Sequence, residues 1–377
     1  MSRTIAYIGL GSNLGDRKNY IDKSLQLLRE TPDITVERVS TIVETKPLSD
    51  ANQPMYLNCA AEIKTSLSAE ELFHRLVLIE NTLSRKRDGK WASRTIDLDL
   101  LLFGDEVINS DTLTVPHSQM HLRSFVLTGL RQLNPNLIHP VLDETVDTLA
   151  GRLNGGDFTL RPDVPQLISI AGNIGAGKTT LAKILADAFK CRAIFEAYDT
   201  NPFLAKVYAG NHDLALDSQL YFLFTRFEQL NPASLEKGKT VVTDYLFQKE
   251  QIYAKLLLNA EQLALYQKFY SIVSPTVADP VLVIHLQNPP TQCLERIHKR
   301  SRPYEQRIEN SFLEAIDDGY EQILRKWKVC PVIRLSNFDC LEENAVDRLA
   351  YRIEYYINPP QADLSAIRVA DKPTKHL

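Results

Sequence analysis

The stretch Gly172-Asn-Ile-Gly-Ala-Gly-Lys178-Thr179 fits the phosphate-binding pattern G-x-x-x-x-G-K-[ST]. Residues 166–171 before it have the composition of a buried strand, and residues 180–189 after it carry apolar side chains at helical spacing. In that setting backbone N–H groups can surround phosphates, Lys178 adds a positive charge, and the Thr179 hydroxyl can hold Mg²⁺. The sequence therefore predicts nucleoside triphosphate binding in the second half of the chain. The expected binding residues are Gly172, Asn173, Ile174, Gly175, Ala176, Gly177, Lys178, Thr179 and Thr180.

Length and composition are those of a globular protein with more than one domain. The chain has 377 residues, 44% of them hydrophobic and 24% charged. A net charge of −4 argues against a nucleic-acid-binding surface as the main function. No apolar run approaches the roughly 18 residues of a membrane span, and the N-terminus lacks the pattern of a signal peptide. We therefore expect a cytoplasmic protein with no membrane partner and no nucleic-acid partner.

The five cysteines are scattered along the chain and include no C-x-x-C pair. That distribution matches neither a disulfide framework nor a zinc site. Reduced thiols, typical of cytosolic proteins, are the expected state.

The first part of the chain alternates between strand and helix patterns. Strands are predicted over 4–10, 34–44 and 56–64, and a helix is predicted over 16–29. Ser68 and Glu71 have the spacing of a capping box at the start of a second helix that runs towards Arg85. With a further strand near 94–103, this order is typical of a ferredoxin-like α+β layer.

Two aspartates, Asp97 and Asp99, stand two positions apart in an apolar segment. On a strand both carboxylates lie on one face, where their repulsion favours a cation between them, so a Mg²⁺ site is predicted. A basic loop containing Trp91 precedes them, and it ends at Arg94. Such a loop suits a polyphosphate, although a basic loop is more often simply solvated and a lone His or Arg more often structural. The conjunction of these features favours a site.

Several motifs in this part resemble the hydroxymethyl-dihydropterin pyrophosphokinases of folate biosynthesis. They are Gly9-Leu-Gly-Ser-Asn-Leu-Gly15, Gln53-Pro-Met-Tyr-Leu-Asn58, Arg94-Thr-Ile-Asp-Leu-Asp99 and Leu113-Thr-Val-Pro-His117. The resemblance covers residues 1–158 and implies transfer of a pyrophosphoryl group from ATP to the hydroxymethyl group of a pterin, with release of AMP. It implies that Asp97 and Asp99 hold two Mg²⁺ ions. It also implies ATP contacts from Arg85, Arg87, Trp91, Arg94, His117 and Arg123, and a pterin pocket of Thr45, Leu48, Tyr56, Asn58 and Phe125.

A connector is predicted between the two halves. Residues 139–164 lose periodicity and contain several glycines and prolines, which indicates the end of the first domain followed by a short connector. We place the linker at 159–165 and the second domain at 166–358. The segment 359–377 has prolines and charges without an apolar period, and it is expected to be mobile.

The second domain places polar side chains where a kinase needs them. Glu196 ends a strand beside the phosphate loop, where a base for an acceptor hydroxyl belongs, and Asp244 ends another strand. Gln219 and Arg226 lie seven residues apart, and therefore on one face of an apolar helix, which suits a flat polar ligand. Arg296, Arg300 and Arg302 either form a solvated face or a lid that closes on a phosphate.

Over about residues 166–357 these positions together resemble the deoxynucleoside kinases, which have a parallel sheet and an α/β P-loop fold. The resemblance implies that Glu196 is the base for the sugar's primary hydroxyl and that Gln219 and Arg226 contact the nucleobase. It also implies that Tyr208 and Glu305 bind the other sugar hydroxyl and that the three arginines form the lid. One departure is that the family commonly has Asp/Glu-Arg-Ser where this chain has Asp244-Tyr245-Leu246. The resemblance further favours a purine deoxynucleoside and a homodimer formed through the second domain.

The leading interpretation is therefore a bifunctional enzyme with two MgATP sites. A second interpretation makes the second half a nucleoside-monophosphate kinase, with Gln219 and Arg226 holding an acceptor phosphate. A third makes one half a non-catalytic nucleotide-binding module, and Tyr245 makes that reading stronger for the second half than for the first.

Overall fold

The computed structural model describes residues 3–48, 53–83, 94–339, 342 and 344–360. These residues form two compact units, one extending to Thr159 and the other spanning Leu160–Ile357. In the ranges described, no helix combines the length and hydropathy that a membrane span requires.

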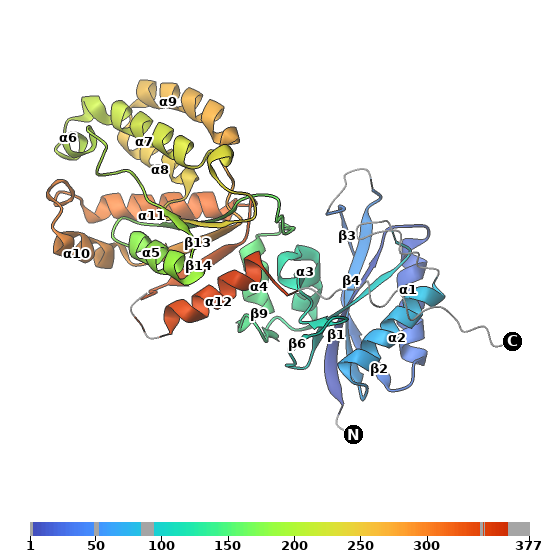
Figure 1. Ribbon diagram of the computed structural model, residues 1–377. Helices are drawn as coiled ribbons and strands as arrows, with labels where there is room; N and C mark the ends of the chain where they lie inside the picture. The colour runs from blue at the N-terminus through green and yellow to red at the C-terminus, as the bar shows by residue number, and fades with distance from the viewer. Residues whose placement is uncertain (1–2, 49–52, 84–93, 340–341, 343, 361–377) are drawn as a thin grey trace. The chain divides into compact units, whose positions relative to one another are not determined.

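Within the described residues, the first unit consists of four α-helices and of strands that differ widely in length (Figure 1). Its helices are α1 (Arg17–Glu30), α2 (Ala69–Thr82), α3 (Ser124–Leu133) and α4 (Val146–Leu153). Its strands are β1 (Thr4–Ser12), β2 (Ile34–Val39), β3 (Val43–Thr45), β4 (Tyr56–Thr65), β5 (Asp97–Phe103), β6 (Ile108–Asn109), β7 (Thr114–Val115), β8 (Ile138–His139) and β9 (Glu144–Thr145).

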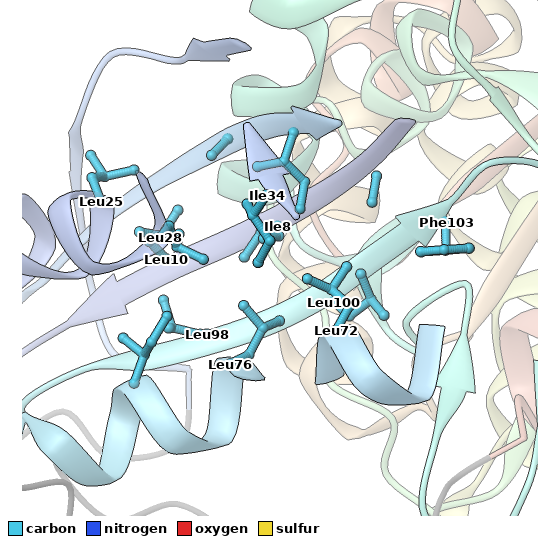
Figure 2. Close-up of a cluster of buried hydrophobic side chains, with 14 of the residues drawn as sticks. Ile8, Leu10, Leu25, Leu28, Ile34, Leu72, Leu76, Leu98, Leu100 and Phe103 are labelled. Carbon is cyan, nitrogen blue, oxygen red and sulfur yellow. The ribbon is translucent and has the colours of Figure 1, made fainter. Parts of the chain in front are cut away.

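The main sheet of this unit is antiparallel, in the order β2-β4-β1-β5, with β3 also paired to β4. Side chains alternate along β1, so Ile8 and Leu10 face one side while Gly9 and Gly11 face the other. On the first side they pack with Leu28 of α1 and Leu76 of α2 in the core shown in Figure 2. On the opposite face, α3 packs on β4, and the glycines leave space beside it along β1.

Both major helices begin with a side-chain cap. The Asp16 carboxylate accepts the backbone N–H of Asn19 at the start of α1. At the start of α2, Ser68 and Glu71 form the capping box that the sequence predicts, each accepting a backbone N–H of the other. These contacts satisfy amide groups that a helix start otherwise leaves without partners.

Two expectations for this unit were wrong in detail. The single strand predicted over 34–44 is divided into β2 and β3 at Ser40, whose backbone N–H and hydroxyl both bond to the backbone of Ala60. The region 139–164, expected to lack periodicity, contains the helix α4 over residues 146–153. Thr145 caps that helix by accepting the N–H of Thr148, a signal that the glycines at 151, 155 and 156 obscure.

The second unit has a parallel five-stranded sheet in the order β11-β12-β10-β13-β14. The predicted parallel sheet is therefore confirmed for this unit. Its strands are β10 (Gln166–Gly172), β11 (Arg192–Ile194), β12 (Thr240–Thr243), β13 (Leu282–Gln287) and β14 (Val332–Ser336). Its helices are α5 (Lys178–Phe189), α6 (Leu204–Tyr208), α7 (Ala215–Gln229), α8 (Glu250–Leu257), α9 (Ala260–Val273), α10 (Pro290–Arg300), α11 (Asn310–Arg325) and α12 (Ala345–Ile357).

Helices cover both faces of this sheet. α5 and α12 contact each other on one face, and α8 and α11 lie on the other (Figure 1). The central strand β10 is buried along its whole length, as expected for a parallel strand covered on both sides. Because the carboxyl ends of β10, β11 and β12 meet at one edge, the loops that follow these strands converge on a single site.

Candidate active sites

The first site lies on the face of the antiparallel sheet that carries the glycines of β1, where there is a cavity of about 290 Å³. The sheet register explains its position. Gly9 pairs with Asp99, Gly11 pairs with Asp97, and Gly11 also pairs with Asn58 of β4. Paired residues project to the same side, so both carboxylates and the Asn58 amide lie beside a strip of backbone that carries no side chains.

Each carboxylate in this cavity pairs with an arginine. Arg94 forms a close ion pair with Asp97, and Arg123 Nη1 lies 3.4 Å from Asp99 Oδ2. His117 Nε2 is 3.9 Å from Asp99 Oδ1, and its Nδ1 accepts the backbone N–H of Gln119 at 3.2 Å. Burial lowers the pKa of His117, whereas the negative charge of Asp99 raises it. Burial has the larger effect, so the neutral imidazole is favoured.

The turn after β1 holds Arg94 in place. Asn13 Oδ1 accepts the backbone N–H of Arg94 at 2.7 Å, and the Arg94 carbonyl accepts the N–H groups of Asn13 and Leu14 at 3.1 Å each. The Ser12 hydroxyl donates to the Thr95 carbonyl at 2.5 Å. Ser12 and Asn13 were not among the predicted site residues, although both lie in the motif Gly9-Leu-Gly-Ser-Asn-Leu-Gly15.

The cavity also gathers the residues expected to bind a pterin. Thr45, Leu48, Tyr56, Asn58 and Phe125 all line it. Asn58 Nδ2 donates to Thr45 Oγ1 at 2.8 Å, which fixes the orientation of the amide. Arg85, Arg87 and Trp91, expected to contact ATP, lie outside the described residues.

Asp97 and Asp99 fit the chemistry of a Mg²⁺ site. Their side chains are 21% and 31% exposed, so their oxygens can be reached from the cavity. In the described part of the chain, no three acidic, histidine or cysteine side chains are arranged so that together they could hold a metal ion. Two carboxylates are the usual protein contribution to a Mg²⁺ site that is completed by substrate phosphates and water.

The second site surrounds the phosphate loop, where a smaller cavity of about 100 Å³ lies at the carboxyl edge of the parallel sheet. Ile174, Gly175, Lys178 and Thr179 line it. Gly175 has φ +79°, and a Cβ atom there would lie 2.5 Å from the Cys293 carbonyl oxygen, so only glycine fits. Lys178 Nζ donates to the Asn173 carbonyl at 2.7 Å, and burial lowers its pKa.

Asp244 connects the loop to the neighbouring strand. One carboxylate oxygen accepts the Thr179 hydroxyl at 2.6 Å and the other accepts the backbone N–H of Glu196 at 2.8 Å. Glu196 does not end β11 as expected, because that strand stops at Ile194. The hydrogen bond to Asp244 holds Glu196 at the cavity even though it lies outside the strand.

Glu196 is enclosed by two cations. Arg226 of α7 pairs closely with one carboxylate oxygen, and Lys249 Nζ lies 2.6 Å from the other. Burial opposes ionisation of Glu196, but the two cations outweigh it and hold its pKa at about 2. Lys249 and Glu250, the second carboxylate paired with Arg226, were not singled out from the sequence.

The nucleobase and sugar candidates lie around the same cavity. Gln219 and Arg226 are both 3% exposed and line it from α7, and Tyr208 and Glu305 line it from other elements. Arg300 and Arg302 also line the cavity and both pair with Glu305, at 2.6 and 3.4 Å. Arg302 contacts the ring and hydroxyl of Tyr198. Arg296, the third expected lid arginine, lies on α10 and is not among the residues that line this cavity.

Comparisons with known proteins agree with this division. Residues 7–135 match the family described as 7,8-dihydro-6-hydroxymethylpterin-pyrophosphokinase, and residues 168–358 match the family described as deoxynucleoside kinase. The pyrophosphokinase of Bacillus subtilis is 47% identical over 129 residues, which are 34% of this chain and 77% of that protein. The deoxyguanosine kinase of Bacillus subtilis is 36% identical over 162 residues, which are 42% of this chain and 78% of that protein.

A solved structure of deoxyadenosine kinase from M. mycoides aligns with a TM-score of 0.44 and 21% identity, covering 50% of this chain and 98% of that one.

The matches to two family models and to the two Bacillus subtilis enzymes establish the family of each unit. The chain belongs to the hydroxymethyldihydropterin pyrophosphokinase family through its first unit and to the deoxynucleoside kinase family through its second, and is an ATP-dependent transferase with two kinase units.

Proposed function

We propose that the first unit transfers a pyrophosphoryl group from ATP to 6-hydroxymethyl-7,8-dihydropterin and that the second phosphorylates the 5′-hydroxyl of a purine deoxynucleoside. The first reaction supplies folate biosynthesis and the second serves nucleotide salvage. The observation that carries the proposal is that each cavity is lined by carboxylates paired with arginines, together with aromatic and amide side chains that suit a flat polar ring. The similarity to a deoxyguanosine kinase supports a purine acceptor.

In the first reaction the pterin hydroxyl oxygen forms a bond to the β-phosphorus of ATP. The bond from that phosphorus to the α,β-bridging oxygen breaks, AMP leaves, and the hydroxyl proton passes to solvent. Mg²⁺ bound to Asp97 and Asp99 would neutralise phosphate charge. Arg94, His117 and Arg123 surround those carboxylates and are placed to hold the triphosphate, while Asn58 and Thr45 orient the pterin.

In the second reaction the sugar hydroxyl oxygen forms a bond to the γ-phosphorus of ATP. The bond to the β,γ-bridging oxygen breaks, ADP leaves, and the hydroxyl proton passes to Glu196. Lys178 and the amides of the phosphate loop hold the triphosphate, and Arg300 and Arg302 contact the transferred group. The Thr179 hydroxyl would hold a Mg²⁺ ion, which would neutralise phosphate charge. Gln219 and Arg226 face the base, and Tyr208 and Glu305 face the other sugar hydroxyl.

The pairing of Arg226 argues against a nucleoside-monophosphate acceptor. Both ends of its guanidinium are bound to carboxylates, Glu196 and Glu250, and it also lies over the rings of Phe222 and Tyr245. An acceptor phosphate would have to displace a carboxylate from a buried ion pair. An uncharged nucleobase would not have to displace a carboxylate. The assembled loop, Asp244 and Glu196 also argue against a non-catalytic module.

The test separates the two activities in one protein. ADP formation is measured with MgATP and each of the four deoxynucleosides, and AMP formation is measured with MgATP and the pterin. Lys178→Ala is expected to abolish the first activity and spare the second, and Asp97→Ala is expected to do the reverse. Loss of both activities in either variant would contradict independent sites. Phosphorylation of monophosphates but not of deoxynucleosides would contradict the proposed acceptor.

We further propose a ferredoxin-like first domain at 1–158, a linker at 159–165 and a kinase domain at 166–358. The element order β1-α1-β2-β3-β4-α2-β5 and the antiparallel strand order β2-β4-β1-β5 support the first assignment, with the short β3 as an addition beside β4. Of the segment 359–377, which is expected to be mobile, residues 361–377 lie outside the described part of the chain. The described cysteines are all free thiols, which supports a cytoplasmic enzyme.

A homodimer through the second unit is proposed from the packed pair α7 and α9. Phe224 of α7 is 44% exposed, and Leu265 and Ile272 of α9 are 44% and 70% exposed. Phe224 and Phe269 form a ring contact between these helices. A second copy would cover these side chains, so Ile272→Glu is expected to halve the mass measured by light scattering. A monomeric wild-type protein would contradict the proposal.

A further inference from the structure

A cation reaches Glu196 from a part of the chain that no sequence motif marks. Lys249 closes a 3₁₀ turn (Phe247–Lys249) after β12, and its ammonium lies 2.6 Å from Glu196 Oε2. The Lys249 side chain is only 4% exposed, so the pair is shielded from solvent. A lysine this deeply buried is rare unless it has a partner, and this one meets the carboxylate placed at the acceptor hydroxyl.

The same region lacks the arginine of the Asp/Glu-Arg-Ser pattern. Tyr245 stands at that position, and it is fully buried with its hydroxyl donated to Gln229 Oε1 at 2.7 Å. Its side chain therefore does not reach Glu196, and the ring instead lies beneath Arg226. Nor do the lid arginines Arg300 and Arg302 take this place, because both pair with Glu305. The second cation at Glu196 comes from four residues further along the chain.

We propose that Lys249 is a positioning residue of the deoxynucleoside kinase site, where it holds the Glu196 carboxylate towards the acceptor hydroxyl in place of the missing arginine. The inference rests on the proposed role of Glu196 as the base. Arg226 fixes one oxygen and Lys249 fixes the other, so together they determine the plane and direction of the carboxylate. Removing Lys249 leaves Glu196 held by Arg226 and by its own backbone bond to Asp244.

The surroundings of Lys249 predict how this role depends on pH. Burial, together with the charges of Arg226 and Lys178, lowers the pKa of Lys249 to about 7, although Glu196 acts in the opposite direction. The Lys249 ammonium lies 5.2 Å from the centre of the Tyr253 ring. Glu250 is paired with Arg226 and so offsets part of the positive charge beside Lys249. Tyr320 of α11, the helix packed against this turn, faces Glu196 as a neutral phenol because burial raises its pKa. As pH rises through about 7, Lys249 loses its charge and Glu196 loses one of its two cations.

The experiment compares full-length wild-type protein with Lys249→Met. At saturating MgATP and pH 6.5, kcat/KM for the best deoxynucleoside is expected to fall about 10- to 100-fold in the variant, the scale of a misplaced reacting group. The wild-type value is expected to decline as pH rises towards 9, while the variant value does not, so the two converge. Lys249→Arg, whose charge persists at every pH used, is expected to lose this decline.

Matched controls separate this role from folding. Lys183→Met removes a lysine of the same unit that lies 5.7 Å from the Phe195 ring, and it is expected to leave kcat/KM unchanged. Binding of MgATP and the thermal unfolding profile show that the second unit of each variant is folded. A wild-type to Lys249→Met ratio that stays constant from pH 6.5 to 9 would overturn the inference, as would wild-type turnover in that variant. Wild-type turnover in Glu196→Gln would overturn the role of Glu196 itself.

Discussion

The hydroxyl of Thr179 lies 2.6 Å from Oδ2 of Asp244, which links the first turn of the phosphate-loop helix to the end of the adjacent strand. The other oxygen of Asp244 accepts the backbone N–H of Glu196 at 2.8 Å. One carboxylate therefore sets the distance between the loop that binds the triphosphate and the proposed base. Asp244 is 2% exposed, so water cannot replace either contact easily.

Asp244→Asn tests this arrangement. A carboxamide has one acceptor oxygen, so it cannot accept both the Thr179 hydroxyl and the Glu196 amide as the two carboxylate oxygens do. We expect kcat of the deoxynucleoside kinase to fall about 100-fold, since small displacements of reacting groups have effects of that size. Pterin-dependent AMP release should be unchanged. Asp187→Asn, an exposed position on α5, is the control, and equal kinase activity in both variants would refute the role of Asp244.

Gly11→Ala is expected to weaken pterin binding. A Cβ atom at Gly11 would lie 2.9 Å from Asn58 Oδ1, and Asn58 is held by its hydrogen bond to Thr45. The amide must therefore move from its position in the cavity. We expect KM for the pterin to rise about tenfold, roughly the 1–3 kcal/mol of a buried polar group left unpaired. Gly9→Ala is a matched control on the same strand, because its Cβ would meet Leu101 at an ordinary 3.5 Å. Equal KM values for the two variants would contradict the steric argument.

Gly175→Ala should abolish deoxynucleoside phosphorylation and destabilise the second unit. Alanine at a positive φ costs about 1–2 kcal/mol, and here the added methyl group would also lie 2.5 Å from the Cys293 carbonyl. Gly210→Ala isolates the first effect, because Gly210 has φ +104° and no atom within 4 Å of its Cβ position. Thermal unfolding should therefore show a larger loss for Gly175→Ala by about 1–3 kcal/mol. Equal losses would mean that backbone strain alone accounts for the glycine.

The first unit is expected to lose stability in acid through His139. Its Nδ1 accepts the backbone N–H groups of Val141 and Leu142 at 3.3 and 3.2 Å, so protonation there would break two hydrogen bonds. Burial lowers the pKa of His139 to about 3, whereas the unfolded chain titrates near the ordinary 6.5. The stabilisation is therefore complete above pH 6.5 and is lost as pH falls towards 3.

Hydrogen exchange of the Val141 and Leu142 amides measures this loss directly. In the wild-type protein the free energy of opening should fall by up to about 1.4 kcal/mol per pH unit between 6.5 and 3. In His139→Gln the opening free energy at pH 7 should be lower but its pH slope shallower. An unchanged slope in that variant would assign the acid sensitivity to other groups.

The sequence predicts most strongly where one local pattern determines the structure. The phosphate loop with its flanking strand and helix is one such case, and the Ser68–Glu71 capping box is another. It fails where partners are distant. Nothing near Lys249 indicates that its ammonium meets Glu196, fifty-three positions earlier, because that contact depends on β11 and β12 lying side by side. Likewise α4, only 8 residues long, gains its stability by packing against α3 rather than from its own composition.

Four arginines that line the two cavities have a consequence for how a nucleotide would bind. Arg94, Arg123, Arg300 and Arg302 each already have an anionic partner within the protein. A triphosphate bound by these arginines, as proposed above, would have to exchange places with a carboxylate rather than meet bare cations surrounded by mobile counterions. Few small ions are released in such an exchange, so the affinity for ATP should fall only gently with added salt. Ionic strength then becomes a weak regulator of both activities, while the local concentration of the divalent cation remains a strong one.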